Sequence, residues 1–208
     1  VNLDANLSRV KRCVEEAGIG FLFAPLMHKA MKHAAIVRKE LGFRTIFNVL
    51  GPLTNPACAQ AQVLGVFDVK WVQPLAQVLY GLGCKHAMVV HGSDGLDEIT
   101  LTGTSHIAEL KNGAVTSYNL DPEKLGFKCC GAEDIKGGTP EENALTIKNI
   151  LGGESGPGRD IVILNSAAAI YVAGKADSLE QGVQLATQSV ESGQAREKLE
   201  TLCEISNS

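Results

Sequence analysis

Hydrophobic residues recur along the chain at spacings that change from one segment to the next, and each change marks a predicted element. Apolar residues return at helical spacing over residues 6–16 and again over residues 26–41, which predicts two helices. In the first of them, Leu7, Val10 and Val14 recur at helical spacing, and Gly18 is expected to end the helix.

From residue 61 the pattern alternates between buried strands and helices. The expected elements are a strand over Val63–Phe67, a helix over Pro74–Leu82 and a strand over Ala87–Val90. Asn112 and Gly113 then form a strong two-residue turn signal between two alternating segments. This signal predicts a hairpin that joins residues 106–110 to residues 115–120.

The C-terminal third of the chain is predicted to be mostly helical. Thr139 and Glu142 form a capping box around Pro140, so a helix is expected to begin there. The glycine-rich stretch over residues 152–158 is predicted to lead into a strand over residues 161–164. Further helices are expected over residues 167–173, 178–192 and 195–205.

This alternation indicates an α/β fold with a mixed sheet and helices on both faces. The 208 residues contain no internal repeat and no long linker, so a single domain over residues 1–208 is expected. Residues 51–56 hold two prolines and a glycine, which predicts a rigid loop.

Composition narrows the class of protein further. The formal net charge of −4 and a pI of about 5.8 argue against nucleic acid as a partner. No apolar run reaches the roughly 18 residues that a membrane helix needs. The six cysteines form no C-x-x-C pair, so we expect reduced thiols in a cytoplasmic protein.

One cation stands out on the predicted helix over residues 26–41. A helical projection places Arg38 among Met27, Met31, Ala34, Ala35 and Leu41. An unpaired buried charge is costly, so Arg38 is expected either to close an ion pair with a core carboxylate or to bind an anionic ligand. His28 lies near enough on the same helix to share a cleft, and a purely structural role is its alternative.

Two adjacent carboxylates, Asp97 and Glu98, end a glycine-containing loop that follows the predicted strand over residues 87–90. Ligands of α/β sheets bind beyond the carboxyl ends of strands. Mg²⁺ is commonly held there by one or two carboxylates and by substrate oxygens. The pair therefore predicts either a magnesium site or an ordinary solvated turn.

Several familiar motifs are absent from the sequence. It contains no G-x-x-x-x-G-K-[ST], no G-x-G-x-x-G that opens a helix after a strand, and no G-x-S-x-G. It contains no H-E-x-x-H either. These absences exclude the usual P-loop, hydrolase and metalloprotease sites.

Taken in order, several segments resemble the anthranilate phosphoribosyltransferases. The matching segments are Phe23–His28, Val37–Gly42, Arg44–Pro56, His91–Glu98 and Asp160–Ser178, which includes Asn165-Ser166-Ala167-Ala168. The resemblance covers nearly the whole chain, and the run from Arg44 to Pro56 is its most specific part. It implies a mixed, mostly parallel sheet in a catalytic domain like that of nucleoside phosphorylases and phosphoribosyltransferases.

The resemblance also implies a reaction and a set of site residues. Members transfer phosphoribosyl from phosphoribosyl pyrophosphate to the amine of anthranilate, release pyrophosphate and require Mg²⁺. Arg38 matches the position that binds anthranilate, and His28 and Pro52 match positions that line its channel. Asp97 and Glu98 match the carboxylates that hold the metal ion.

Some features of the family have no counterpart in this sequence. Its Gly-Thr-Gly-Gly-Asp loop and Lys-His-Gly-Asn segment do not occur, and the first residue is Val1. We therefore expect the sequence to be the C-terminal part of a longer enzyme, homodimeric through an N-terminal helical domain, and to turn over little substrate alone. Residues 51–56 match the hinge region between the family's two domains.

Three other hypotheses remain at this stage. A pyrimidine nucleoside phosphorylase shares the implied fold and similar sugar-phosphate chemistry. A non-catalytic relative that binds nucleic acid is a second alternative, because fold alone does not fix function. A structural remnant that binds nothing is the third.

Overall fold

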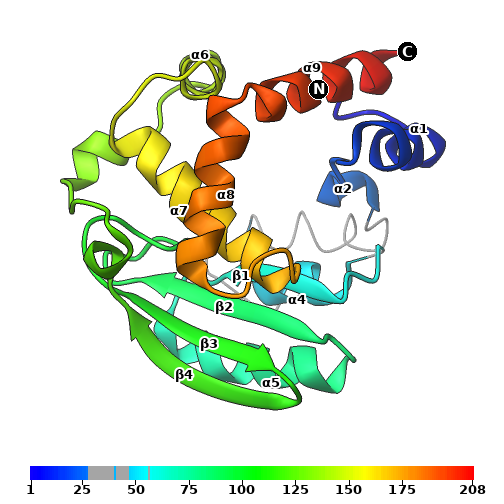
Figure 1. Cartoon of the computed structure of the whole chain (residues 1–208). Helices are drawn as coiled ribbons and strands as arrows, with labels where there is room; N and C mark the ends of the chain where they lie inside the picture. The colour runs from blue at the N-terminus through cyan, green and yellow to red at the C-terminus, as the bar shows by residue number, and fades with distance from the viewer. Residues whose placement is uncertain (28–39, 41–46, 56) are drawn as a thin grey trace. The chain divides into compact units, whose positions relative to one another are not determined.

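The computed structural model describes residues 1–27, 40, 47–55 and 57–208 (Figure 1). Its contacts divide the chain into two compact units, of which the first comprises Val1–Cys58 and Gly193–Ser208 and the second Ala59–Ser192. The single domain expected over residues 1–208 stays a prediction. Arg38 and His28, with most of the helix predicted around them, lie outside the described residues.

The described part of the first unit is helical. Its elements are α1 (Leu7–Arg12), a π-helical turn (Cys13–Ala17), α2 (Ala24–Met27), α4 (Phe47–Leu53) and α9 (Gln194–Asn207). Asn6 caps α1, because its Oδ1 accepts a hydrogen bond from the Arg9 N–H at 3.0 Å. The first and last predicted helices are therefore confirmed.

Of the three apolar residues that recur at helical spacing in the first helix, one is buried. Leu7 is 67% exposed and Val14 is 49% exposed, whereas Val10 is buried. Cys13 and Ala17 instead pack with Leu202 and Ile205 of α9. Val10, Cys13 and Ala17 recur at helical spacing, so they form the buried face in place of Leu7 and Val14.

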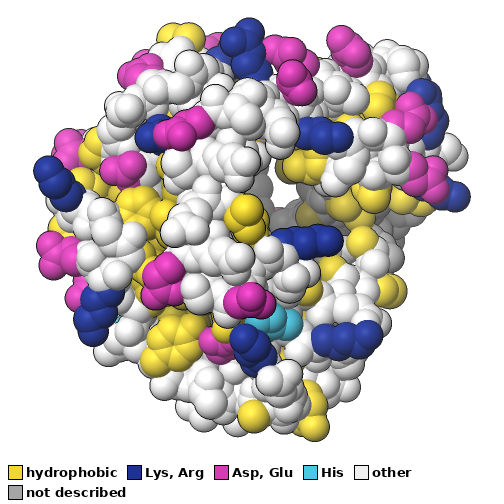
Figure 2. Space-filling model, viewed as in Figure 1, with side chains coloured by type: hydrophobic (Ala, Val, Ile, Leu, Met, Phe, Trp, Pro, Cys, Tyr) yellow, Lys and Arg dark blue, Asp and Glu magenta, His cyan; other side chains and the backbone are white. Residues whose placement is uncertain are grey.

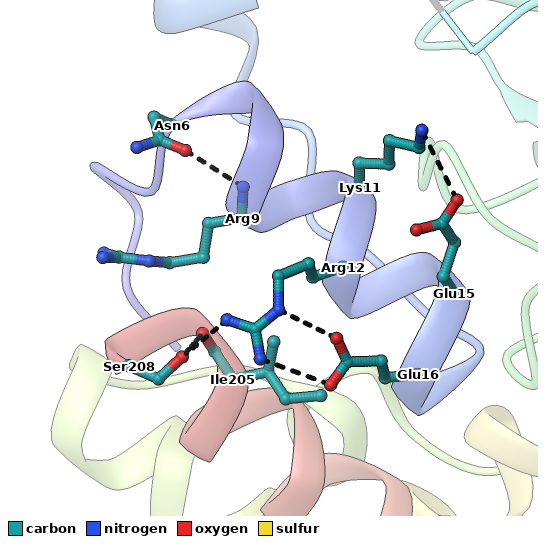
Figure 3. Close-up of polar contacts among 8 residues, drawn as sticks. All are labelled: Asn6, Arg9, Lys11, Arg12, Glu15, Glu16, Ile205 and Ser208. Carbon is teal, nitrogen blue, oxygen red and sulfur yellow. Dashed lines mark hydrogen bonds and ion pairs between the residues drawn. The ribbon is translucent and has the colours of Figure 1, made fainter.

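One arginine joins the two ends of the chain within this unit (Figure 3). The Arg12 guanidinium donates to both carboxylate oxygens of Glu16, at 2.8 and 3.3 Å, and to the Ser208 hydroxyl at 3.3 Å. The Ser208 hydroxyl in turn donates to the Ile205 carbonyl. The contacts of Arg12 are exposed to water, so they orient the helix ends and add little stability.

The prediction of a loop over residues 51–56 is wrong for residues 51–53. Gly51, Pro52 and Leu53 form the end of α4. Proline also disfavours a helical conformation at the residue before it, in part through a clash with that residue's Cβ, and Gly51 has no Cβ. Thr54 then ends the helix by donating from its hydroxyl to the Leu50 carbonyl at 2.9 Å. The hinge role of the segment stays a prediction.

The second unit holds the described sheet. Its elements are β1 (Ala61–Gly65), α5 (Val72–Gly81), β2 (His86–Gly92), β3 (Ser105–Lys111), β4 (Ala114–Leu120), α6 (Pro140–Leu151), α7 (Pro157–Val172) and α8 (Leu179–Glu191), with 3₁₀ turns at Val69–Trp71, Pro122–Leu125 and Ala132–Ile135. The strands of this part of the chain form one sheet in the order β1-β2-β3-β4.

The sheet is mixed, as predicted, but it is not mostly parallel. Only β1 and β2 run parallel, with Gly65 opposite Val90, whereas β2–β3 and β3–β4 are antiparallel pairs within the described residues. The hairpin signal accounts for one antiparallel pair. Asn112 and Gly113 have φ angles of 52° and 76°, which a tight two-residue hairpin turn requires.

Helices cover both faces of the sheet, as the sequence predicts (Figure 1). Residues 87–90 of β2 are all buried, although successive side chains point to opposite faces. Helix α5 packs against β2 and β3, and α7 packs against β1 and β2. The core on the α7 side consists of Met88, Val90, Ile99, Leu101, Ile107, Leu120, Leu164, Ala168 and Val172.

Helix α7 contradicts the strand predicted over residues 161–164. These residues belong to one helix that begins at Pro157 and runs to Val172. A short apolar run has no periodicity that separates a strand from a buried helix. Burial at Leu164, Ala168 and Val172 follows the helical spacing of i and i+4.

Two predicted helix starts are confirmed in this unit. The Thr139 hydroxyl accepts from the Glu142 N–H, and the Glu142 carboxylate accepts from the Thr139 N–H at 2.7 Å, which completes the capping box of α6. Ser178 caps α8 through the Gln181 N–H. Helix α8 packs closely on α7, because a Cβ atom at Gly182 would lie 2.6 Å from the Ala167 carbonyl oxygen.

A buried carboxylate lies between the sheet and α7. Glu109 is 7% exposed and accepts hydrogen bonds from the Tyr171 hydroxyl at 2.8 Å and the Tyr118 hydroxyl at 3.0 Å. His86 Nε2 is 3.0 Å from the same carboxylate, and Lys111 donates to the Tyr171 hydroxyl. Burial, followed by the Glu109 charge, raises the pKa of Tyr118 far above its ordinary value.

Candidate functional site

The Asp97–Glu98 pair lies in the loop that connects β2 to β3, which we call the carboxylate loop (residues 93–104). The loop begins at the carboxyl end of β2, beside the carboxyl end of the parallel strand β1. Both carboxylate residues are exposed. The edge where parallel strands end is where α/β sheets bind ligands, so the predicted location of the pair is confirmed.

A contact with β1 sets the position of Asp97. Gly65 is the last residue of β1, and a Cβ atom there would overlap the carbonyl oxygen of Asp97. The absence of a side chain at Gly65 thus lets the carboxylate loop lie directly on the end of the strand.

Asp94 holds the interior of the carboxylate loop together. Its Oδ2 accepts from the Thr100 hydroxyl at 2.6 Å and from the Thr102 hydroxyl at 2.7 Å. Its Oδ1 accepts from the Leu96 N–H at 3.1 Å. These three contacts join both sides of the loop around one carboxylate.

The same contacts determine the charge state of Asp94. Partial burial raises its pKa, but the hydroxyls of Thr100 and Thr102 and the Leu96 N–H outweigh that effect, so the pKa lies below the ordinary value of 3.8. Asp94 is therefore an anion at neutral pH and serves as a structural acceptor.

Buried residues anchor the second half of the loop. Ile99 and Leu101 are fully buried in the core on the α7 side. Thr100 between them is also fully buried, and its N–H donates to the Ser105 hydroxyl at 2.9 Å. Asn165 of α7 contacts the backbone of Ile99, with its Oδ1 accepting from the Ile99 N–H at 3.0 Å. The exposed carboxylates thus rest on a fixed backbone.

His91 lies at the end of β2 and ties it to the segment after β1. Its Nδ1 is 2.8 Å from the Val66 carbonyl oxygen. A carbonyl oxygen only accepts hydrogen bonds, so Nδ1 carries the proton in this contact. The Val66 N–H donates to the Val90 carbonyl, which extends the parallel pairing by one residue.

The two neighbouring carboxylates suit a divalent cation that a ligand helps to hold. Partial burial and then the charge of Asp97 raise the pKa of Glu98, and a bound cation would relieve that repulsion. Within the described ranges, no group of three or more histidine, cysteine, aspartate or glutamate residues could enclose a metal ion. Asp97 and Glu98 are hard oxygen donors of the kind that would hold Mg²⁺ together with water and substrate oxygens.

The structure describes three of the five predicted site residues. Asp97 and Glu98 lie side by side in the second unit, whereas Pro52 is exposed on α4 in the first unit. Arg38 and His28 lie outside the described residues. Their assignment to an anthranilate site stays a prediction.

Three residues support the site although no role was predicted for them from the sequence. Gly65, Asp94 and Asn165 all support the carboxylate loop. Two of them have a local signal. Gly65 ends an apolar strand, and Asp94, which is followed by Gly95 and later by Thr100 and Thr102, is typical of a turn. Asn165 carries no local signal, because it acts on a residue 66 positions away.

The surface carries charged side chains of both signs. Acidic and basic side chains are interspersed on the face drawn in Figure 2, with no continuous basic stripe across it. A nucleic-acid backbone binds through such a stripe. In the part of the chain that the structure describes, no helix combines the length and apolarity needed to cross a bilayer.

Comparison with protein families gives one match that covers most of the chain. Residues 1–196 match the model of the glycosyl transferase family, a/b domain. Among curated relatives, anthranilate phosphoribosyltransferase of Acetivibrio thermocellus is 52% identical over 208 residues, which cover 100% of this chain and 60% of the relative. The enzyme of that name from Rhodopseudomonas palustris is 53% identical over 206 residues, or 99% of this chain and 61% of the relative.

Solved structures give the same result. A crystal structure of anthranilate phosphoribosyltransferase from Thermus thermophilus matches with a TM-score of 0.93 and 47% identity, over 100% of this chain and 62% of that one. The Saccharomyces cerevisiae enzyme in complex with PRPP and Mg matches with a TM-score of 0.88 and 26% identity, over 99% of this chain and 59% of that one. The chain thus spans about 60% of the length of the relatives it matches.

Proposed function

The chain belongs to the glycosyl transferase family, and from that membership we propose that it carries the metal-binding part of an anthranilate phosphoribosyltransferase active site. The reaction would transfer phosphoribosyl from phosphoribosyl pyrophosphate to anthranilate. The observation that carries the proposal is the Asp97–Glu98 pair at the common carboxyl end of β1 and β2. The relatives at about 50% identity bear the name of this enzyme.

The chemistry explains why such a site needs carboxylates rather than a strong base. In the transfer, the amine nitrogen of anthranilate forms a bond to C1 of the ribose, and the bond from C1 to the pyrophosphate oxygen breaks. The electron pair leaves with pyrophosphate, and the nitrogen loses its proton to solvent. Mg²⁺ held by Asp97 and Glu98 would neutralise the charge of this leaving group.

The remaining site residues keep the roles that the resemblance assigns. Arg38 would bind the carboxylate of anthranilate, because a guanidinium matches a carboxylate with two parallel hydrogen bonds. His28 and Pro52 would line the path of this substrate. All three assignments rest on position in the matching segments, and substitution tests them directly.

Binding of inorganic pyrophosphate tests the metal site. Isothermal titration calorimetry of the 208-residue chain should detect binding of pyrophosphate that depends on Mg²⁺. Asp97→Ala should weaken this binding by about tenfold or more, as loss of a metal ligand does. Glu154→Ala removes an exposed carboxylate elsewhere and should leave the affinity unchanged. Equal binding by wild type and Asp97→Ala would disprove the assignment.

A substrate assay tests the Arg38 assignment. In an active form of the enzyme, Arg38→Ala should raise the KM for anthranilate about tenfold or more while the KM for phosphoribosyl pyrophosphate changes little. An unchanged anthranilate KM would count against this role. The 208-residue chain itself should turn over little substrate, since its sequence lacks Gly-Thr-Gly-Gly-Asp.

Three further properties are part of the proposal. Mg²⁺ is proposed as the cofactor because the donor set consists of hard oxygen ligands. A cytoplasmic location is supported by the free thiols of Cys13, Cys84, Cys129, Cys130 and Cys203. A homodimer of the enzyme is proposed from the resemblance, and light scattering after size-exclusion chromatography would test it.

A further inference from the structure

The side chain of Asn165 pairs with both backbone groups of one distant residue. Its Oδ1 accepts from the Ile99 N–H at 3.0 Å, and its Nδ2 donates to the Ile99 carbonyl at 2.9 Å. Nδ2 also donates to the Ile161 carbonyl in its own helix at 3.0 Å. The amide therefore makes the same pair of hydrogen bonds to the Ile99 backbone that a residue of a neighbouring strand makes. Asn165 is 66 positions away from Ile99 in the sequence.

This contact acts at the residue that follows the carboxylate pair. Ile99 is fully buried, whereas Glu98 directly before it is exposed. Because the peptide bond is planar, a fixed Ile99 N–H also fixes the carbonyl end of Glu98. In the peptide group between the two carboxylate residues, the Asp97 carbonyl lies against Gly65. The peptide groups before and after Glu98 are thus both held by distant parts of the chain.

The contacts within the carboxylate loop do not replace the contact between Asn165 and Ile99. Asp94 accepts from the Leu96 N–H before the pair and from the hydroxyls of Thr100 and Thr102 after it. The Thr100 N–H donates to the Ser105 hydroxyl. None of these bonds involves Asp97, Glu98 or Ile99. Asn165 comes from α7, which is packed against β1 and β2. It therefore connects the direction of the carboxylates to the packing of a helix.

We propose that Asn165 is a positioning residue, which orients the Asp97 and Glu98 carboxylates toward a divalent cation that carries pyrophosphate. The inference rests on the proposed function, since it takes Asp97 and Glu98 as the metal ligands. Residues that orient metal ligands typically change metal affinity by about 10- to 100-fold when they are removed.

Asn143 provides a control, because it is an asparagine that makes a similar pair of bonds away from the carboxylate loop. Asn143 is half-buried like Asn165, and it makes the same pair of bonds with one backbone residue. Its Oδ1 accepts from the Gly138 N–H at 2.8 Å, and its Nδ2 donates to the Gly138 carbonyl at 3.2 Å. This pair supports the segment before α6. Removing Asn143 thus breaks equivalent bonds that have no part in the carboxylate loop.

The experiment measures binding of Mn²⁺ with inorganic pyrophosphate to the 208-residue chain, by electron paramagnetic resonance of the bound ion. Asn165→Ala should weaken binding about tenfold or more, whereas Asn143→Ala should leave it within about twofold. Leu164→Val removes buried volume from the same helix and lowers the melting temperature without touching the contact. Its binding should also stay within about twofold of wild type.

A second variant covers the case in which Asn165→Ala does not fold. Asn165→Asp keeps the volume and the acceptor for the Ile99 N–H, but it places a carboxylate against the Ile99 and Ile161 carbonyls. The same loss of binding is expected. If the folded Asn165 variants bind like wild type while Asp97→Asn does not, the positioning role is wrong and the metal site stands. If Asp97→Asn binds like wild type, the proposed function itself fails.

Discussion

The backbones of Gly65 and Asp97 are in direct contact, and no side chain fits between them. A Cβ atom at Gly65 would overlap the carbonyl oxygen of Asp97 and would lie 2.7 Å from its carbonyl carbon. Backbone atoms do not move aside as a flexible side chain does. The end of strand β1 therefore sets how near the carboxylate loop comes to the sheet.

Gly65→Ala should displace Asp97 and weaken pyrophosphate binding in the presence of Mg²⁺ by about tenfold, because the ligand carboxylate moves with its backbone. The overlap should also lower the free energy of unfolding by about 1–3 kcal/mol, as overpacked positions do. Calorimetry measures the first effect and urea denaturation the second.

Gly81→Ala is the control for this substitution. No atom lies within 4 Å of a Cβ at Gly81, which ends α5. Alanine favours a helix over glycine by up to about 1 kcal/mol, so stability should rise slightly and binding should stay unchanged. Equal binding by the Gly65 and Gly81 variants would show that the contact does not position Asp97.

The anionic Asp94 should make the carboxylate loop sensitive to acid. Its folded pKa lies below the ordinary 3.8, so its contribution is present at neutral pH and is lost as pH falls through the folded pKa. Asp94→Asn should reduce the free energy of unfolding by about 1–2 kcal/mol at pH 7. The difference from wild type should shrink below pH 3.8 in urea denaturation.

Asp4→Asn provides the comparison, since Asp4 is exposed at the start of the chain. This variant should change the free energy of unfolding by less than about 0.5 kcal/mol. A constant difference between wild type and Asp94→Asn from pH 7 down to pH 2 would contradict the proposed ionisation.

Removal of the buried carboxylate should be among the more damaging substitutions. Glu109→Ala would leave the hydroxyls of Tyr118 and Tyr171 without their acceptor in a region sheltered from water. The free energy of unfolding should fall by about 3 kcal/mol. Urea denaturation should show less than about 0.5 kcal/mol for Glu133→Ala, whose pair with Lys136 is exposed. Similar losses for both variants would refute the argument.

Close packing of α7 and α8 gives a further prediction. A methyl group at Gly182 would contact the Ala167 carbonyl oxygen at 2.6 Å, so Gly182→Ala should force the helices apart. A loss of about 1–3 kcal/mol in the free energy of unfolding is expected. Unaltered thermal unfolding of this variant would mean that the helices separate without strain.

The elements that the sequence predicted correctly depend on neighbouring residues. The turn at Asn112-Gly113 and the capping box at Thr139 both act within a few positions, and both are present in the structure. The Asp97–Glu98 pair could likewise be placed at a strand end, because the strand before it is a clear apolar run.

The features that the sequence could not predict depend on distant partners. The apolar run over residues 161–164 fits a strand as well as a helix until its packing against the sheet is known. Val14 has the right spacing for burial, but the partner surface of α9 lies beside Cys13 and Ala17 instead. The role of Asn165 is of the same kind, since its partner Ile99 is far away in sequence.

The contacts of the carboxylate loop also imply an order of assembly. Its bonds among Asp94, Thr100, Thr102 and Ser105 span at most 8 positions, so they can form as soon as β2 and β3 pair. The bond to Asn165 spans 66 positions and requires a much larger closure of the chain. The loop should therefore acquire its shape early in folding, while the carboxylates acquire their final direction only when α7 docks.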